Sequence, residues 1–296
     1  YLDLYNNQLT SFDGTGLSGL TTLYLYYNQL TSFDGTGLSG LTELYLQNNQ
    51  LTSFDGTGLS GLIYLSLYGN QLTSFDGTGL SSLTYLELTN NQFTSFDGTG
   101  LSSLTELYLP NNQLTSFDGT GLSSLTNLTL YNNQLTSLDL TSLTGLTELY
   151  LGDNQLTSFD GTDLSSLTGL ELYDNQLTSL DVSMMTLLNT IGLCESKVSK
   201  LDKPVPSNVV NWSKEGTNPM TATSNDAILA ALVTNGLIGT FQTGGGRTLA
   251  SNSDYDNLVS LGWNLQGLDL APTFITSKSV GETINIYAQT STGFWK

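Results

Sequence analysis

The chain has 296 residues, and its 26 acidic and 7 basic side chains give a net charge of −19 at pH 7. All seven Lys and Arg residues lie at Lys197 or later, so residues 1–196 carry no cationic side chain. Nucleic acids and anionic membrane surfaces are bound through basic side chains, so this charge distribution argues against both as partners. No apolar run has the length of a membrane-spanning helix.

The residue types that most catalytic sites require are missing. The chain contains no histidine and a single cysteine, Cys194, which excludes Ser-His-Asp or Cys-His catalysis, an internal disulfide and a zinc site of several Cys or His ligands. Paired carboxylates at the spacing of a retaining glycosidase would lie on an open, wet strand face where little raises the pKa of one partner. The glycine-rich run at 243–247 lacks the Lys of a phosphate loop. We therefore expect no enzymatic activity and assign no catalytic residue.

One asparagine recurs every 21 residues over nine units, at Asn7, Asn28, Asn49, Asn70, Asn91, Asn112, Asn133, Asn154 and Asn175. Leucine precedes each Asn by five and by three positions and follows it by two, with Phe93 once in its place. A tenth, degenerate unit follows, with Ile191 and Leu193 in the strand and Ser196 at the Asn position. A fixed period of this length is typical of a solenoid whose units stack on one another.

Each unit predicts one short strand followed by a tight return. The alternation at residues 23–25 is typical of a strand whose leucines face inward. Asn28 follows the strand, where its amide can donate to and accept from the backbone of its own coil and the next. The run from Asp34 to Gly37 has turn chemistry, because glycine permits positive φ and aspartate bonds its own backbone. The remaining core positions of this unit are Phe33, Leu38 and Leu41.

The pattern LxxLxLxxNxL, spelled LTTLYLYYNQL at residues 20–30, resembles the signature of leucine-rich repeats. The 21-residue period and the LTSFD or LTSLD turn resemble bacterial-type internalin and BspA-like surface repeats, and similar repeats of phage and virus proteins. The resemblance covers residues 1–202. It implies an α/β-type solenoid, a right-handed coil with a parallel sheet on its concave face, and an extracellular place on a cell or virion surface.

The outward positions of the strands differ from unit to unit, whereas the rest of the unit is nearly constant. Tyrosine fills many of them, and it offers a large, rigid and amphipathic contact area at low entropic cost. Strand propensity alone also favours tyrosine, but it gives no reason for the variation. We therefore predict a ligand-binding concave face made of Tyr24, Tyr26, Tyr45, Tyr64, Tyr68, Tyr85, Glu87, Glu106, Tyr108, Tyr131, Tyr150 and Tyr173.

The absence of cations in this region favours a neutral or cationic ligand. A glycan stacked on tyrosine and held by polar side chains fits, and so does a basic patch on a protein. The alternative is a structural role, in which the repeats form a fibre or layer by self-assembly and the concave face contacts neighbouring subunits. A bacterial effector that enters host cells is a weaker third interpretation, since no catalytic domain is visible.

Two rows of carboxylates raise the question of a cofactor, which we otherwise expect to be absent. Asp153, Asp174 and Glu195 fall at one position of consecutive units, about 5 Å apart, and form either a calcium site or an exposed acidic patch. A second row either caps the turns or binds cations along its length. Its members are Asp13, Asp34, Asp55, Asp76, Asp97, Asp118, Asp139, Asp160, Asp181 and Asp202.

The composition changes after residue 202. Residues 203–271 are predicted to form a C-terminal cap, with an irregular connection at 203–222, helices at 224–236 and 251–263, and strands at 237–243 and 264–270. Residues 272–296 alternate like the start of a further β module, which we expect to be truncated.

Overall fold

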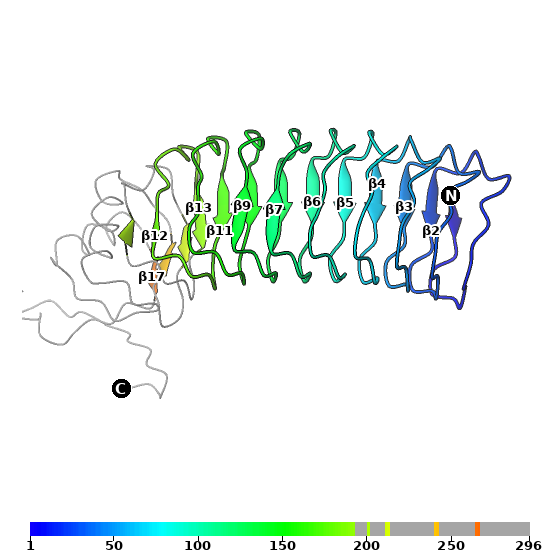
Figure 1. The fold of residues 1–296 in the computed structure, drawn as a ribbon, viewed down its shortest axis with the longest axis horizontal. Helices are drawn as coiled ribbons and strands as arrows, with labels where there is room; N and C mark the ends of the chain where they lie inside the picture. The colour runs from blue at the N-terminus through cyan, green and yellow to red at the C-terminus, as the bar shows by residue number, and fades with distance from the viewer. Residues whose placement is uncertain (193–199, 202–210, 214–239, 243–263, 267–296) are drawn as a thin grey trace, which may run out of the picture.

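The computed structural model describes residues 1–192, 200–201, 211–213, 240–242 and 264–266 (Figure 1). The regular elements in these ranges are all β-strands. Among the same residues, no helix has the length and apolarity needed to cross a membrane.

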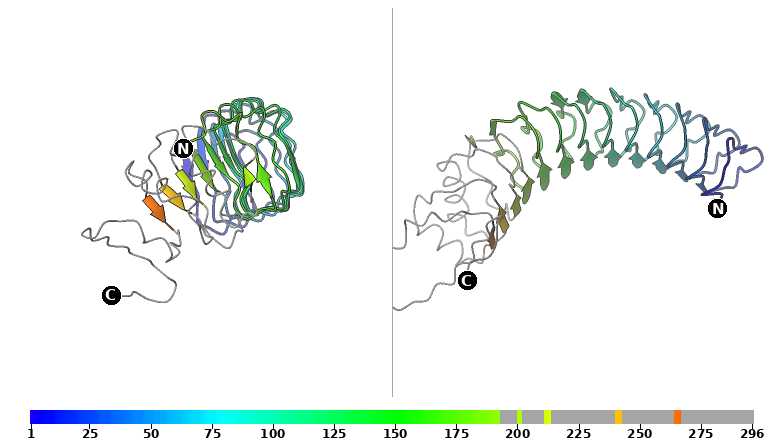
Figure 2. Two further views of the ribbon diagram at one scale, coloured as in Figure 1. Left: turned by 90° about the vertical axis from the view of Figure 1, so that its left-hand side faces the viewer. Right: turned by 90° about the horizontal axis from the view of Figure 1, so that it is seen from below.

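The strands of successive coils form one parallel sheet of 13 strands in the order β1-β2-β3-β4-β5-β6-β8-β10-β11-β13-β15-β16-β17. Between consecutive repeats the register advances by one repeat unit, so that Leu23 pairs with Leu44, and Leu44 with Leu65. Figure 2 shows these strands along the inner edge of an arc, as the resemblance implied. Their bounds are β1 Leu2–Asp3, β2 Thr22–Tyr24, β3 Glu43–Tyr45, β4 Tyr64–Ser66, β5 Tyr85–Glu87, β6 Glu106–Tyr108, β8 Asn127–Thr129, β10 Glu148–Tyr150, β11 Gly169–Glu171, β13 Thr190–Gly192, β15 Asn211–Ser213, β16 Thr240–Gln242 and β17 Asn264–Gln266.

The return segments form two further strand pairs, β7 (Ser116–Asp118) with β9 (Ser137–Asp139) and β12 (Ser179–Leu180) with β14 (Lys200–Leu201). The expected α/β character is therefore wrong for residues 1–192, whose connections are turns and short strands. The reason is local, because most returns contain an Asp-Gly step and a glycine at positive φ, such as Gly37 at 85°. These residues interrupt any helix within so short a unit.

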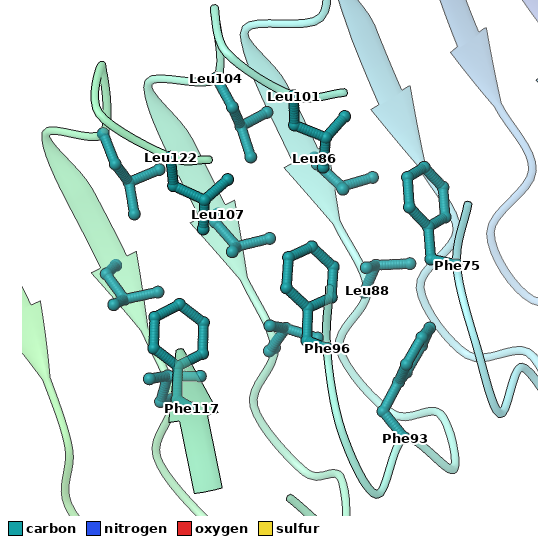
Figure 3. Close-up of a cluster of buried hydrophobic side chains, with 14 of the residues drawn as sticks. Phe75, Leu86, Leu88, Phe93, Phe96, Leu101, Leu104, Leu107, Phe117 and Leu122 are labelled. Atoms are coloured by element: carbon teal, nitrogen blue, oxygen red, sulfur yellow. The ribbon is translucent and has the colours of Figure 1, made fainter. Parts of the chain in front are cut away.

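Every coil contributes the same apolar side chains to one continuous core. Figure 3 shows side chains of several neighbouring coils. In the coil that contains β5, the side chains without exposed surface include Leu86, Leu88, Leu101 and Leu104, and Phe96 closes the outer side. The phenylalanines stack between coils, with ring centroids 6.1 Å apart for Phe33 and Phe54 and 5.8 Å for Phe54 and Phe75. The predicted core positions are thus confirmed in the described repeats.

The repeated asparagine connects neighbouring coils, as predicted. Asn112 Oδ1 accepts a hydrogen bond from the backbone N–H of Phe93 at 3.1 Å. Its Nδ2 donates to the carbonyl oxygens of Leu88 in the preceding coil at 3.1 Å and of Leu109 in its own coil at 3.0 Å. The same three bonds recur in the other inner coils, and the Asn is buried in each of them. The buried carbonyls of Leu88 and Leu109 each accept from two successive asparagines, so the row as a whole satisfies backbone groups that the coils would otherwise leave unpaired.

The turn that follows the core phenylalanine is constant for steric reasons. Asp34 Oδ1 accepts the backbone N–H of Thr36 at 2.8 Å, which closes the turn. A Cβ at Gly56 would lie 2.9 Å from the side chain of Leu80 in the next coil, so close stacking of the coils requires glycine there. The row of turn aspartates therefore caps the turns, from Asp13 to Asp181 in the described repeats.

The predicted irregular connection at 203–222 is wrong at Asn211–Ser213, which form β15 and pair with β13. Trp212 lies 21 residues after its partner Ile191, so the repeat period continues to this strand and could have been read from the sequence. Strands β16 and β17 fall within the spans 237–243 and 264–270, where strands were expected. The two predicted helices and the β module at 272–296 lie outside the described residues.

Candidate functional site

The surface that we call the concave face consists of the outward side chains of the strands from β1 to β13 that belong to the 13-stranded sheet, with the residues two and three positions after each of these strands. The first and third residues of a strand point outward on either side of a buried leucine, as Glu106 and Tyr108 do around Leu107. The parallel register places equivalent residues of successive coils side by side, one strand spacing apart.

Five tyrosines on neighbouring strands form a continuous row of ring contacts, two of them stacked and two tilted, that we call the tyrosine ladder: Tyr24, Tyr45, Tyr64, Tyr85 and Tyr108. The successive ring centroids lie 4.7, 4.8, 4.3 and 5.2 Å apart. The ladder crosses from the third strand position to the first between Tyr45 and Tyr64, and it returns to the third at Tyr108. Offset stacking at these distances is favourable, so each ring helps to hold its neighbours in place.

The stacking restricts how the ladder can meet a ligand. A sugar ring packs against the flat face of an aromatic ring, but the inner members of the ladder, such as Tyr64 and Tyr85, cover each other's faces. Ring edges and hydroxyl groups are what such a stack leaves for a partner. Contacts of that kind suit a protein surface better than a stacked sugar.

Three strands carry the sequence Glu-Leu-Tyr, and in each the tyrosine hydroxyl donates to the glutamate of the same strand. The donor–acceptor distances are 3.4 Å for Tyr45 to Glu43, 2.7 Å for Tyr108 to Glu106 and 3.2 Å for Tyr150 to Glu148. Glu148 also accepts the hydroxyl of Thr168 at 2.7 Å. The bonds fix both side chains while each carboxylate keeps further acceptor capacity.

The described residues 1–192, which form this face, contain no Lys, Arg or His, so no positive side chain from within the face neutralises its carboxylates. Burial raises the pKa of Glu87, and burial together with the charge of Glu148 raises the pKa of Glu171. Burial and the nearby Glu43 raise the pKa of Tyr45 to about 12. The pKa of Tyr108 is also raised, by burial and by its hydrogen bond to Glu106. The face is therefore a negatively charged surface without internal compensation.

At the C-terminal end of the concave face, three glycines leave room for long side chains of adjacent coils. A Cβ added at Gly169 or Gly192 would lie within van der Waals overlap of the carboxylate of Glu148 or Glu171, respectively. A Cβ at Gly152 would overlap the ring of Tyr173. In this half of the sheet, long side chains thus lie over the bare backbone of an adjacent coil.

The residue types found directly before the repeated asparagines have a structural explanation that the sequence analysis missed. The residue before each repeated asparagine has positive φ, between 47° and 66°, in all nine described coils. Asn, Asp and Gly adopt this conformation most readily, which accounts for Asn132, Asp153 and Asp174 without a ligand. Tyr27, at φ 54°, is the exception in the column.

The proposed calcium ligands are only partly described, because Glu195 lies outside the described residues. Burial and the charge of Asp153 raise the pKa of Asp174, so the two carboxylates are close enough to repel each other. Within the described part of the chain, no group of three or more Asp, Glu, Cys or His side chains is arranged to hold a metal ion. Calcium binding, here or along the turn aspartates, stays a prediction.

The structure thus brings Tyr24, Tyr45, Tyr64, Tyr85 and Tyr108 of the predicted set together, with Glu87 and Glu106 beside them. Tyr26 stacks on Tyr5 at 4.9 Å and meets Tyr24 of the ladder edge-on at 6.2 Å. Tyr68, Tyr131 and Tyr173 lie in the column after the strands, and Tyr150 lies beyond the ladder on β10. The prediction omitted Glu43 and Glu148, although the thrice-repeated Glu-Leu-Tyr was the signal for both.

Comparisons with known proteins agree with this architecture. The family described as leucine-rich repeats in two copies matches residues 18–61, 81–123, 102–142 and 123–166, and the family described as leucine-rich repeat matches residues 40–93. Together they cover residues 18–166, about half of the chain. No curated protein sequence is significantly similar to the chain.

Several solved structures are similar over most of the chain. The functional domain of InlJ from Listeria monocytogenes is 26% identical with a TM-score of 0.64, and the match covers 91% of this chain and 63% of that one. This chain therefore spans less than two thirds of the InlJ chain. A leucine-rich repeat protein from Leptospira interrogans is 26% identical, with a TM-score of 0.65 and coverages of 91% and 79%.

An internalin, InlF from Listeria monocytogenes, is 23% identical with a TM-score of 0.61 over 91% of this chain and 86% of that one, a likeness that shows the fold alone. InlJ is described as containing a cysteine ladder, whereas this chain has one cysteine and builds its buried ladder from asparagine. The period, the stacked coils, the asparagine ladder and the family matches together show that the chain belongs to the leucine-rich repeat proteins.

Proposed function

We propose that the chain is a non-catalytic recognition module that binds a protein ligand through its concave face. The observation that carries the proposal is the contrast within each coil. The core and the turns repeat almost letter for letter, while the outward strand positions change and collect tyrosine and glutamate. Folding alone requires the constant part, so the variable part is the one available for selection by a ligand.

The character of the face supports a protein ligand. Curved repeat arrays present extended concave surfaces, which proteins of this architecture use for binding. Tyrosines held rigidly by stacking, as in the ladder from Tyr24 to Tyr108, lose little entropy when a partner binds. The uncompensated carboxylates favour a partner with a basic surface.

Glycan binding is the second candidate, and one observation favours it. Tyr150 has no ring stacked on it among the described residues, and its hydroxyl bonds to Glu148. An aromatic ring beside a carboxylate is suited to a sugar as well as to a protein. A structural role in a fibre or layer, with the concave face buried between copies, is the outcome to expect if no external ligand is found.

The proposal is tested by two parallel screens of the purified protein, a glycan array and a displayed peptide library, each with calcium and with chelator. The variant Tyr45→Ala/Tyr108→Ala alters the concave face, and Asp97→Asn/Asp118→Asn is its control on the turns, where the amide oxygen still accepts the turn hydrogen bond.

Saturable peptide binding that is lost only in the tyrosine variant would support protein recognition. Binding confined to the glycan array would replace the protein ligand with a sugar, and dependence on calcium would support the predicted metal. No binding in either screen, together with self-association of the protein, would favour the structural role. The predicted surface location is checked separately by labelling intact cells or particles with an antibody.

A further inference from the structure

Tyr27 stands at a position that does not suit a tyrosine. The residue before each repeated asparagine has positive φ in the nine described coils, and in the eight others it is Asn, Asp or Gly. Tyr27 adopts φ 54° with a large side chain, a conformation that Asn reaches at lower cost. The fold of this coil therefore gains nothing from tyrosine that the other coils do not obtain from smaller residues.

A second unfavourable feature lies in the adjoining coil. The backbone N–H of Tyr27 donates to the carbonyl oxygen of Gln47 at 2.9 Å, so the two residues are direct neighbours. The side-chain oxygen of Gln47, Oε1, is buried and accepts no hydrogen bond within the described part of the chain. An unpaired buried acceptor lowers stability. Departures of this kind from what a scaffold prefers are typical of functional surfaces.

The ring of Tyr27 is open to solvent and supported from one side. It is 57% exposed, and the one ring it meets among the described residues is that of Tyr26, 5.8 Å away at an interplanar angle of 68°. Such an edge-to-face contact occupies at most one face of a ring, so at least one face of Tyr27 carries no other ring. Tyr26 is itself fixed by stacking on Tyr5 at 4.9 Å. The inner rings of the tyrosine ladder cover each other, whereas Tyr27 presents a free face.

The surroundings of Tyr27 are polar and nearly uncharged. From residue 1 to residue 30, Asp3 is the only charged side chain outside the turns. Asn6 and Asn48 occupy the same column as Tyr27 in the preceding and the following coil, and their backbones bond across the coils in the same register. Each amide side chain can both donate and accept a hydrogen bond. This corner therefore combines an open aromatic face with neutral hydrogen-bonding groups on either side.

A neutral sugar ring matches this combination. One side of a pyranose exposes C–H groups, which are attracted to the electron-rich face of an aromatic ring, and its hydroxyls can pair with amides beside that ring. A protein hot spot matches it less well, because hot spots lie near the centre of an interface in packed and dry pockets, whereas Tyr27 stands in the last column of the concave face. A cationic group would find its counter-charges farther along the face, where the glutamates begin at Glu43.

We propose that Tyr27 is the stacking platform of a carbohydrate subsite, in which the amides of Asn6 and Asn48 bind the hydroxyls of the sugar and Tyr26 supports the ring. The strain at Tyr27 then has a reason, because only an aromatic side chain supplies such a platform. The subsite lies outside the tyrosine ladder. The inference goes beyond the proposed function, since it assigns a second class of ligand to the N-terminal part of the concave face.

The test is an NMR titration of the protein, labelled with ¹³C in its tyrosine rings, with methyl β-glucopyranoside, glucitol and methyl β-glucuronide. The glucoside should bind with about millimolar affinity and shift the ring signal of Tyr27, which is identified by its loss in Tyr27→Asn. Glucitol has the hydroxyls without the ring and should cause no shift. The glucuronide should bind more weakly, because the acidic face repels its charge. A glucoside shift that is absent, or no larger than that caused by glucitol, would overturn the subsite.

Substitutions separate binding from folding, with binding followed by saturation transfer to the signals of the glucoside. Tyr27→Asn relieves the strain, so it should keep the fold while weakening glucoside binding about tenfold or more. Tyr27→Phe keeps the ring face and should retain most of the affinity. Tyr1→Asn makes the same substitution at a tyrosine that is 87% exposed, and this matched control should bind like the wild type. Undiminished glucoside binding by Tyr27→Asn would overturn the subsite.

This proposal and the proposed function fail separately. A selected peptide that binds through the tyrosine ladder should lose its affinity in Tyr45→Ala/Tyr108→Ala and keep it in Tyr27→Asn. If that peptide binds and the glucoside does not, protein recognition stands and the carbohydrate subsite falls. If the glucoside does not bind and Tyr27→Asn weakens the peptide, Tyr27 belongs to the protein-binding surface, and the carbohydrate subsite falls as well.

Discussion

The two halves of the concave face share a scaffold and differ in surface. From β2 to β6 each strand contributes one tyrosine to the ladder, whereas from β8 to β13 the face holds Thr129, the single tyrosine Tyr150 on β10, three glycines and glutamates that lie over the neighbouring coil. The backbone register and the buried leucines are the same in both halves. The shape of the binding face is therefore set by a few outward residues per coil, and the fold tolerates very different choices at these positions.

The asparagine ladder should be equally important in both halves, and its removal should have the largest effect. Asn112→Ala and Asn154→Ala each leave one buried N–H unpaired and remove one of the two asparagine hydrogen bonds that each of two buried carbonyls accepts, and each should cost about 2–4 kcal/mol of unfolding free energy. Urea denaturation followed by circular dichroism measures both. Asn111→Gly is the control, because glycine suits the positive φ of that residue. A clearly smaller loss for Asn154 would mean that the scaffold is not uniform.

A tyrosine of the tyrosine ladder, in the first half, should contribute more to the free energy of unfolding than an unstacked tyrosine in the second half. Tyr85 stacks on Tyr64 at 4.3 Å and contacts the tilted ring of Tyr108 at 5.2 Å, so Tyr85→Ala should cost about 1–2 kcal/mol. Tyr131→Ala, which breaks no stacked pair, should cost less than half as much. The same denaturation experiment decides this, and equal losses would show that stacking adds nothing to ordinary burial.

Among the residues directly before the repeated asparagines, Tyr27 alone has a side chain poorly suited to the positive φ of that position. Tyr27 has φ 54°, a conformation that costs a non-glycine side chain about 1–2 kcal/mol. It is 57% exposed, and its ring meets only Tyr26, at 5.8 Å. Tyr27→Asn should therefore raise the unfolding free energy by about 0.5–1 kcal/mol. Tyr26→Asn, at an ordinary φ, serves as the control and should not be stabilising. Destabilisation by Tyr27→Asn would indicate that the contact with Tyr26 outweighs the strain.

The smallest expected effect concerns one half-buried glutamate in each half, Glu87 and Glu171. Burial raises the pKa of both, so the ionised form is disfavoured in the folded protein. A raised carboxyl pKa lowers stability above the folded pKa, and the penalty disappears as the pH falls below the unfolded pKa of about 4.3. Glu87→Gln and Glu171→Gln should therefore raise the melting temperature at pH 7 and not at pH 3.5. The same gain at both pH values would refute the electrostatic origin.

The pKa values of the turn aspartates shift in the opposite direction to those of Glu87 and Glu171, which provides an internal check. Hydrogen bonds from the following threonine lower the pKa of Asp34, Asp55 and Asp97. A lowered pKa contributes stability above the unfolded pKa, and this stability is lost as the pH falls through the folded value. Asp97→Asn should consequently lose its effect at acidic pH, in the opposite sense to Glu87→Gln.

The sequence by itself determined the architecture of the repeats. A period of 21 residues aligns identical letters on neighbouring coils, so the buried leucines, the asparagine ladder and the columns of the concave face could all be assigned from spacing. The same period extends to Trp212 and could have predicted β15, but the changed composition led instead to the wrong prediction of an irregular connection. The turn aspartates could also be assigned, because an Asx turn is a local structure that depends on residues two apart.

Only the tertiary structure determined the backbone conformation and the side-chain contacts of the residues in the columns of the concave face. Positive φ before each asparagine is imposed by the chain's exit from the strand, and it explains Asp153 and Asp174 by conformation where the sequence suggested a ligand. The direction of each tyrosine ring depends on the side chains of both adjacent coils, so neither the ladder nor its interruption at Thr129 could be read from composition. Spacing along the chain fixes which residues are neighbours, whereas packing between coils fixes how their side chains meet.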